Sequence, residues 1–264
     1  MTQHWVDPYA GFAYTPEQIS VTREHQHEKL AACGIDASVF GDDVDPSFFI
    51  GLAIHAGINS GITAQGNINM LQNLRVYRAP QLDENLHVTG LIRDVKPVPR
   101  GRTLHSEVSF SDADGEVVIQ ANRVSLKPDP DAQASRGAGD KPAPIVTDVS
   151  MLQTARTYQL TPDGVKAYSS EGNSIHYEEA AAISAGFRAP LIGGGMGVHF
   201  LMAHLWGVGD SRRPASFSTD IYFRRPIFWD EAVTVAVDRG AVPEVMALLK
   251  PDGKVGTELT LHRL

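Results

Sequence analysis

The chain has 264 residues, of which 42% are hydrophobic and 20% are charged, and its formal net charge at pH 7 is -8. This composition is typical of a globular protein with a sizeable core, built as one large domain or two small ones. The acidic balance argues against a nucleic-acid surface, and the single cysteine, Cys33, excludes an intramolecular disulfide and a cysteine-rich metal site.

The amino terminus, MTQHWVDPYAGF, has neither the basic start nor the apolar segment of a secretory signal peptide. We therefore expect a cytoplasmic protein. The longest apolar stretch, Phe48 to Ile62, is interrupted by His55 and Asn59. It is also shorter than the ~20 residues that a bilayer crossing requires, so no membrane span is predicted.

The first half of the chain predicts two helices followed by antiparallel strands. Residues 15–32 begin with Thr-Pro-Glu, a typical helix start, and predict a helix that is polar over much of its surface. Residues 46–61, PSFFIGLAIHAGINSG, are apolar on all sides and predict a buried helix. Residues 74–126 contain alternating apolar and polar segments and a hairpin turn at Asp114-Gly115, which together predict strands.

The second half of the chain repeats the plan of the first. The stretch LRVYRAPQLDENLHV resembles DIYFRRPIFWDEAVTV, because Arg78 and Pro80 of the first recur as Arg224 and Pro226 of the second, each 146 positions later. Such a repeat predicts two copies of one fold. Between the copies, the segment KPDPDAQASRGAGDKPAP is rich in Pro, Gly, Ala and Asp and indicates a linker.

Residues 168–206 contain the candidate catalytic residues of the chain. In their polar loop, Glu171 and His176 are separated by small residues that favour irregular backbone, so a carboxylate and an imidazole can converge on one water. A short helix is expected over residues 177–185. A second helix starts in the run Gly193–Gly195 and is apolar nearly all the way round, which predicts burial. The unpaired N–H groups of its first turn could donate hydrogen bonds to a thioester oxygen that gains negative charge during a reaction.

The order of these residues resembles a known motif. SSEGNSIH followed by AGFRAPLIGGG is similar to the motif of MaoC-like, (R)-specific enoyl-CoA hydratases and dehydratases, SGDxNPxH followed by GFxxPIAHG. Glu171 stands where that family has Asp, Ser174 where it has Pro, and Gly193 where it commonly has His. The resemblance implies an enzyme that interconverts a trans-2-enoyl thioester and a 3-hydroxyacyl thioester, with coenzyme A as the expected carrier and R as the expected configuration.

The resemblance also implies the fold and the domain organisation. A buried helix followed by antiparallel strands, present twice, resembles the hotdog fold. We therefore expect an α+β double hotdog, in which two antiparallel sheets each wrap around a central buried helix. The expected parts are an N-terminal degenerate hotdog over residues 1–126, a linker over 127–146 and a C-terminal catalytic hotdog over 147–264.

The resemblance assigns roles to residues of the second copy. Glu171 and His176 would act as acid and base, Asn173 would orient the loop, and the backbone N–H of Gly194 would stabilise an enolate oxygen. No metal and no cofactor are implied, and the expected partner is an acyl-CoA or acyl-carrier thioester, with a homodimer left open. The candidate substrate-binding residues are Arg188, Gly193, Gly195, Arg224 and Arg225. Guanidinium groups suit phosphate, although surface arginines on strands and loops are commoner.

Two other functions fit the same fold expectation. A hotdog thioesterase would use a carboxylate to activate water at the thioester carbonyl, and a non-catalytic protein would only bind the acyl thioester. The replacement of the family's Asp by Glu171 keeps the second alternative open, since one extra methylene moves the carboxylate by roughly an ångström and a half.

Overall fold

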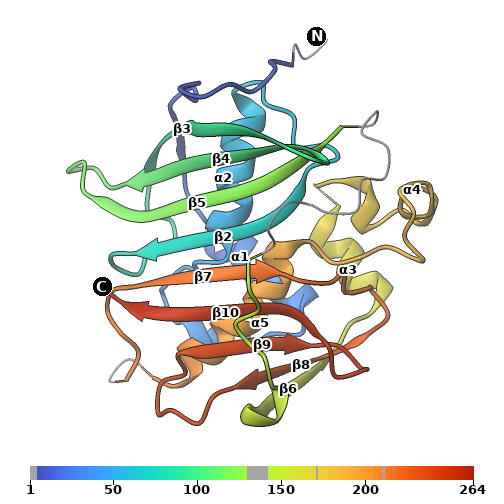
Figure 1. The fold of residues 1–264 in the computed structure, drawn as a ribbon. Coiled ribbons are helices and arrows are strands. Elements are labelled where there is room, and N and C mark those ends of the chain that lie inside the picture. Colours follow the sequence, from blue (N-terminus) through green and yellow to red (C-terminus); the bar gives the residue numbers. More distant parts are fainter. Residues whose placement is uncertain (1–4, 130–141, 171, 210–211) are drawn as a thin grey trace.

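Ten strands join into one antiparallel sheet, with the order β1-β3-β4-β5-β2-β7-β10-β9-β8-β6. The structure is a computed structural model, and it describes residues 5–129, 142–170, 172–209 and 212–264. The five strands at one end of the order come from the first half of the sequence, and the five at the other end come from the second half (Figure 1).

The helices and strands follow one another in a similar order in the two halves of the chain. The first half contains β1 (Glu17–Ile19), α1 (Arg23–Ala32), η1 (Ala37–Phe40, a 3-10 helix), α2 (Phe48–Asn59), β2 (Ile68–Val76), β3 (Leu86–Val98), β4 (Gly101–Ser111) and β5 (Val117–Pro128). The second half contains η2 (Val149–Met151), β6 (Gln153–Gln159), α3 (Pro162–Ser169), η3 (Ser174–His176), α4 (Glu179–Ser184), α5 (Gly194–Gly207), β7 (Phe217–Phe223), β8 (Ala232–Val237), β9 (Val245–Leu249) and β10 (Val255–Arg263).

The expectation of two separate sheets is corrected by the pairing of β2 with β7. These strands run antiparallel, with Leu74 opposite Thr219 and Val76 opposite Phe217. They are the corresponding strands of the sequence repeat, so each copy covers the edge that the other would leave exposed. The α+β class and the antiparallel pairing were predicted correctly, but the sheet is continuous across both copies.

The two predicted apolar helices lie on one face of this sheet. Figure 1 shows α2 across the strands of the first copy and α5 across those of the second. Ten of the fourteen residues of α5 are buried, on every side of the helix. Phe49 of α2 and Phe200 of α5 are each fully buried, in keeping with the all-round apolar sequences of the two helices.

The predicted linker falls partly outside the described residues, which exclude 130–141. Where the chain is described again, it crosses the face of the sheet opposite α5 (Figure 1). The backbone N–H groups of Ile145 and Val146 donate to the carboxylate of Glu258 on β10, at 2.9 and 3.0 Å. The end of the expected linker is therefore held on the second half, while the domain boundaries themselves stay a prediction.

The prediction of a helix starting at Thr15 is wrong. Residues 17–19 form the short strand β1, which pairs with β3, and α1 begins only at Arg23. The hydroxyl of Thr22 caps α1 by accepting from His25 N at 3.1 Å. Both Thr15 and Thr22 could cap a helix, but residues 17–19 pair with β3 as a strand, so the helix begins after Thr22.

No helix in the described parts of the chain is long and apolar enough to cross a membrane. The Asp114-Gly115 hairpin turn is present between β4 and β5, with Gly115 at a φ of 84° that favours glycine.

The two Thr residues give a test of the helix start. We expect Thr22→Ala to lower the free energy of unfolding by about 1 kcal/mol, because His25 N would lose its capping acceptor. Thr15→Ala is the matched control and should change it by less than about 0.5 kcal/mol. Urea unfolding followed by circular dichroism measures both, and equal losses would contradict the assignment of the cap.

Candidate active site

The first turn of α5 presents backbone donors without acceptors. The N–H groups of Gly194, Gly195 and Met196 have no hydrogen-bond acceptor among the described residues, and the N-cap, Gly193, has no side chain to supply one. A Cβ on Gly194 would lie 2.7 Å from the Phe223 ring at the end of β7, so only glycine fits there. The turn combines unpaired donors with the positive end of the helix dipole, and it suits a partial negative charge.

His176 lies beside this turn and is held in one orientation. Its Nδ1 is 2.7 Å from the carbonyl oxygen of Leu191. Because a carbonyl only accepts, Nδ1 carries the proton, and in the neutral ring Nε2 is left as an acceptor. A Cβ on Gly193 would lie 3.8 Å from Nε2, so this nitrogen faces the glycine run across a space that a side chain would fill.

Burial sets the charge state of His176. Desolvation lowers the pKa of its imidazole, and the hydrogen bond to the Leu191 carbonyl opposes this only in part. The ring is therefore neutral at pH 7, with a free lone pair on Nε2. A neutral imidazole in this tautomer can accept a proton or hold a water molecule beside the α5 turn.

The loop before His176 is ordered by its own side chains. Asn173 caps the 3-10 helix η3 by accepting from Ile175 N through its amide oxygen, at 3.3 Å. Leu191, whose carbonyl oxygen holds His176, is itself bound to this loop, because its N–H donates to Ile175 O at 3.4 Å. Glu171, the predicted acid, lies outside the described residues, so its predicted position beside His176 stays a prediction.

A buried hydrogen-bonded chain on the other side of the turn was missed by the sequence reasoning. Asp45 Oδ2 is 2.7 Å from His199 Nδ1, and His199 Nε2 is 2.8 Å from the Tyr168 hydroxyl. The side chains of Asp45 and His199 are completely buried. A Cβ on Gly195 would lie 3.5 Å from the Tyr168 hydroxyl oxygen, so the chain ends at the α5 turn.

The sequence did contain a signal for this chain. His199 was the polar residue early in a helix apolar on every side, and such a residue needs a buried partner. Asp45 stands just before α2, and its carboxylate also accepts from Ser47 N at 2.8 Å. Burial raises the pKa of Tyr168 well above its usual range, so its hydroxyl remains neutral. Nothing in the sequence indicated that the three residues come together.

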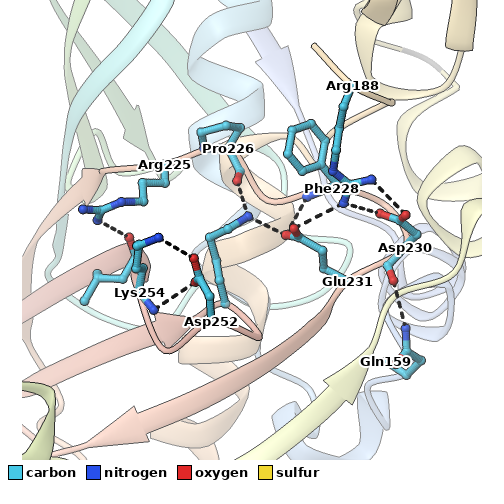
Figure 2. A network of polar contacts seen from close by, with 11 residues as sticks. Gln159, Arg188, Arg225, Pro226, Phe228, Asp230, Glu231, Asp252 and Lys254 are labelled. Atoms are coloured by element: carbon cyan, nitrogen blue, oxygen red, sulfur yellow. Dashed lines mark hydrogen bonds and ion pairs between the residues drawn. The ribbon is translucent and has the colours of Figure 1, made fainter.

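The predicted phosphate-binding arginines are engaged with protein groups. Arg188 forms a two-pronged ion pair with Asp230, at 2.9 and 2.8 Å, and its guanidinium lies 4.0 Å from the centre of the Phe228 ring. Figure 2 shows this pair in a network that continues through Glu231 to neighbouring strands and loops. Arg225 donates to the carbonyl oxygen of Val255 at 2.9 Å.

Arg224 is the most constrained of the three arginines. Its Nε donates to the fully buried carboxylate of Glu258 at 2.5 Å, and its two Nη atoms donate to the carbonyl oxygens of Pro142 and Ala143. It holds the last part of the predicted linker, residues 142–143, onto the sheet. In the described structure no polar contact joins these arginines to His176 or to the α5 turn, and their role in binding phosphate stays a prediction.

No group of three or more His, Cys, Asp or Glu residues within the described ranges is arranged to hold a metal ion. The polar groups that do converge are His176, the unpaired amides of α5 and the Tyr168 hydroxyl. They are suited to proton transfer and to the stabilisation of a developing oxyanion.

Comparisons with known proteins establish the fold. No protein-family model matches the sequence, and no curated protein matches it. Among solved structures, HtdX from Mycobacterium tuberculosis is similar over 94% of this chain and 98% of its own, at 18% identity and a TM-score of 0.74. A MaoC-like dehydratase from Phytophthora capsici is similar over 98% of both chains, at 15% identity and a TM-score of 0.69.

A further M. tuberculosis protein, described as having a double hotdog fold, is similar over 97% of this chain and 98% of its own, at 13% identity and a TM-score of 0.60. The double hotdog fold implied by the motif resemblance is therefore confirmed. At these identities the likenesses establish the fold, and the activity has to be argued from the site.

The arginines give a test of which contacts stabilise the fold. We expect Arg224→Gln to lower the free energy of unfolding by about 2–3 kcal/mol, since it leaves the buried carboxylate of Glu258 without its cation. Arg188→Gln is the matched control, and it should cost less than about 1 kcal/mol because Asp230 is half exposed. Urea unfolding compares the two, and a larger loss at Arg188 would contradict this ranking.

Proposed function

We propose that the chain is a hydratase or dehydratase that interconverts a trans-2-enoyl thioester and a 3-hydroxyacyl thioester, with coenzyme A as carrier and the R configuration at the hydroxyl carbon. The observation that carries the proposal is the pairing of His176 Nε2 with the α5 turn across the Cβ position of Gly193. The motif resemblance and the fold shared with MaoC-like dehydratases support the same activity.

The α5 turn would stabilise the oxygen of the thioester. When water adds to the β-carbon, electrons move towards the carbonyl, and its oxygen gains negative charge as an enolate forms. The N–H groups of Gly194 and Gly195 are unpaired at this point of the helix and would donate to that oxygen. Such donors act without reorganisation because the helix fixes them before the reaction.

His176 and Glu171 would supply the proton transfers. In hydration the water gives its hydroxyl to the β-carbon and one proton to the pair, and the pair returns one proton to the α-carbon. The acceptor lone pair of His176 Nε2 suits it to hold the water in hydration and, in the reverse direction, to take the proton from the α-carbon. Glu171 would take the proton of the attacking water, as the resemblance implies. No net charge remains on either residue after a full turnover.

Product analysis tests this proposal against its rivals. We expect the purified protein, given crotonyl, longer-chain and bulky enoyl-CoA thioesters, to lower the ultraviolet absorbance of the enoyl thioester as the double bond is hydrated. Chromatography should then show a 3-hydroxyacyl-CoA with the thioester intact. Release of free thiol would identify a thioesterase instead, and binding without any product would identify an acyl-thioester binding protein.

The acid–base pair predicts a kinetic pattern. We expect Glu171→Ala and His176→Ala each to lower turnover by about two to four orders of magnitude. The double variant should be scarcely slower than either single one, because a unit that lacks one member leaves little for the other to do. Near-normal turnover by Glu171→Ala would show that another group is the base.

The charge state of His176 predicts the pH dependence of the reaction. Its lowered pKa means that the neutral ring persists as the pH falls through the usual histidine range, about 6.5. We therefore expect kcat/KM to stay level through that range and to decline only at lower pH. A pH-rate profile, with the ring titrated by NMR and assigned by loss of its signal in His176→Gln, measures this. A decline centred at or above the usual range would contradict the assigned tautomer and burial.

A further inference from the structure

The hydrogen bonds of the chain Asp45–His199–Tyr168 have a direction that is set at the buried end. Asp45 Oδ1 accepts from the backbone N–H of Ser47 at 2.8 Å and from the Ser47 hydroxyl at 2.6 Å. The other oxygen, Oδ2, lies 2.7 Å from His199 Nδ1. Because an ionised carboxylate only accepts hydrogen bonds, His199 Nδ1 carries the proton of this contact and donates it to Asp45.

The tautomer of His199 in turn orients the hydroxyl of Tyr168. In a neutral imidazole with its proton on Nδ1, Nε2 is an acceptor. This nitrogen lies 2.8 Å from the Tyr168 hydroxyl, which therefore donates its hydrogen to His199. Burial raises the pKa of Tyr168 well above its usual range, so the hydroxyl keeps that hydrogen. Towards any other group, the oxygen of Tyr168 can only accept a hydrogen bond.

This oriented oxygen lies beside the donors of the α5 turn. It is 3.5 Å from the Cβ position of Gly195, whose N–H has no acceptor among the described residues. Since N and Cβ of one residue are about 2.5 Å apart, the oxygen lies no more than about 6 Å from the Gly195 nitrogen. No residue in the described ranges donates to the Tyr168 oxygen. The turn therefore presents donors and an oriented acceptor close together.

Tyr168 and His176 approach the turn at different glycines. His176 Nε2 is 3.8 Å from the Cβ position of Gly193, whereas the Tyr168 hydroxyl faces the position of Gly195. In the proposed reaction, His176 works on the acyl carbons next to the thioester carbon, so the acyl arm lies on the Gly193 side. The sulfur is the other substituent of the thioester carbon, and it would then leave towards Gly195 and Tyr168.

We propose that Tyr168 is a substrate-binding residue whose oriented oxygen accepts a hydrogen bond from the amide N–H of the pantetheine arm that carries the acyl group. The proposal rests on the proposed function, in which the thioester oxygen occupies the α5 turn. The pantetheine amide follows the thioester sulfur after two methylene groups, which brings its N–H within reach of Tyr168. Asp45 and His199 are positioning residues, because they act on the substrate only through Tyr168.

The fixed direction of the hydroxyl makes this contact selective. A hydroxyl that can rotate freely either donates or accepts, and it tolerates both kinds of ligand group. The hydrogen of Tyr168 is held by His199, so a ligand that turns a lone pair towards Tyr168 leaves both oxygens unsatisfied. A site built to pair with a donor discriminates against an analogue that lacks it.

Saturated thioesters test the proposal, because they can bind but cannot be hydrated. The probes are the butyryl thioester of N-acetylcysteamine, which contains the amide N–H, and its analogue with an ester oxygen in place of that N–H. NMR titration of the full chain measures both Kd values. We expect wild type to bind the amide about tenfold more tightly, and Tyr168→Phe to bind the two probes equally. Tyr77→Phe removes an exposed hydroxyl of the first copy and should keep the preference.

Asp45→Asn tests the positioning roles. The amide oxygen of the new side chain would keep both Ser47 donors, so its NH2 group would face His199 Nδ1 and donate to it. Nε2 of His199 would then carry the proton and donate to Tyr168, whose own hydrogen would turn towards the ligand. We therefore expect this variant to prefer the ester probe. A preference for the amide as strong as in wild type would overturn the roles of Asp45 and His199.

Measuring binding separates this inference from the proposed function. Equal binding of the two probes by wild type, or a preference that survives in Tyr168→Phe, would overturn the role of Tyr168 even in a chain that hydrates enoyl thioesters. Loss of the preference in Tyr77→Phe would also overturn it. Binding of neither probe at millimolar concentrations would overturn this proposal and the thioester function together.

Discussion

The buried contact between Asp45 and His199 is the interaction on which the arrangement of the two copies depends. Asp45 precedes α2 of the first copy and His199 lies in α5 of the second, and both side chains are completely buried. Separating them would leave a carboxylate and an imidazole without partners in an apolar interior, which costs several kcal/mol. Because Tyr168 extends the same chain to the α5 turn, the contact between the copies also fixes one wall of the candidate site.

The start of each central helix explains why the candidate site lies in the second copy. In α2 the N–H groups of Phe48, Phe49 and Ile50 donate to backbone carbonyls, at 3.1 to 3.2 Å, and Asp45 accepts from Ser47 N. In α5 the corresponding donors are unpaired, because the glycine run neither caps them nor covers them. Two helices with the same place in the fold therefore differ in their capacity to bind an anion at the N-terminus.

Much of this could be predicted from the sequence, and the failures have physical causes. The all-round apolar pattern of α2 and α5 correctly predicted burial, and the repeat of Arg78 and Pro80 correctly predicted two copies. The sequence did not predict that β2 and β7 would pair, since edge-to-edge contact depends on the placement of whole copies. Nor did it predict the contact of His199 with Asp45, 154 residues away in the chain. Local patterns carry no information about such partners.

In the candidate site, too, local arrangements could be predicted and long-range contacts could not. The position of His176 next to the glycine run could be anticipated from the motif, because the loop and the run are linked by a short helix and by the hydrogen bond from Leu191 N to Ile175 O. The partners of the arginines could not be anticipated, because Arg224 pairs with a carboxylate on the neighbouring strand β10, 34 residues later in the chain. A guanidinium is equally suited to phosphate and to carboxylate, so its partner is decided by the tertiary fold. Where the fold supplies a carboxylate, as at Arg188 and Arg224, the cation is structural and is not free to bind phosphate.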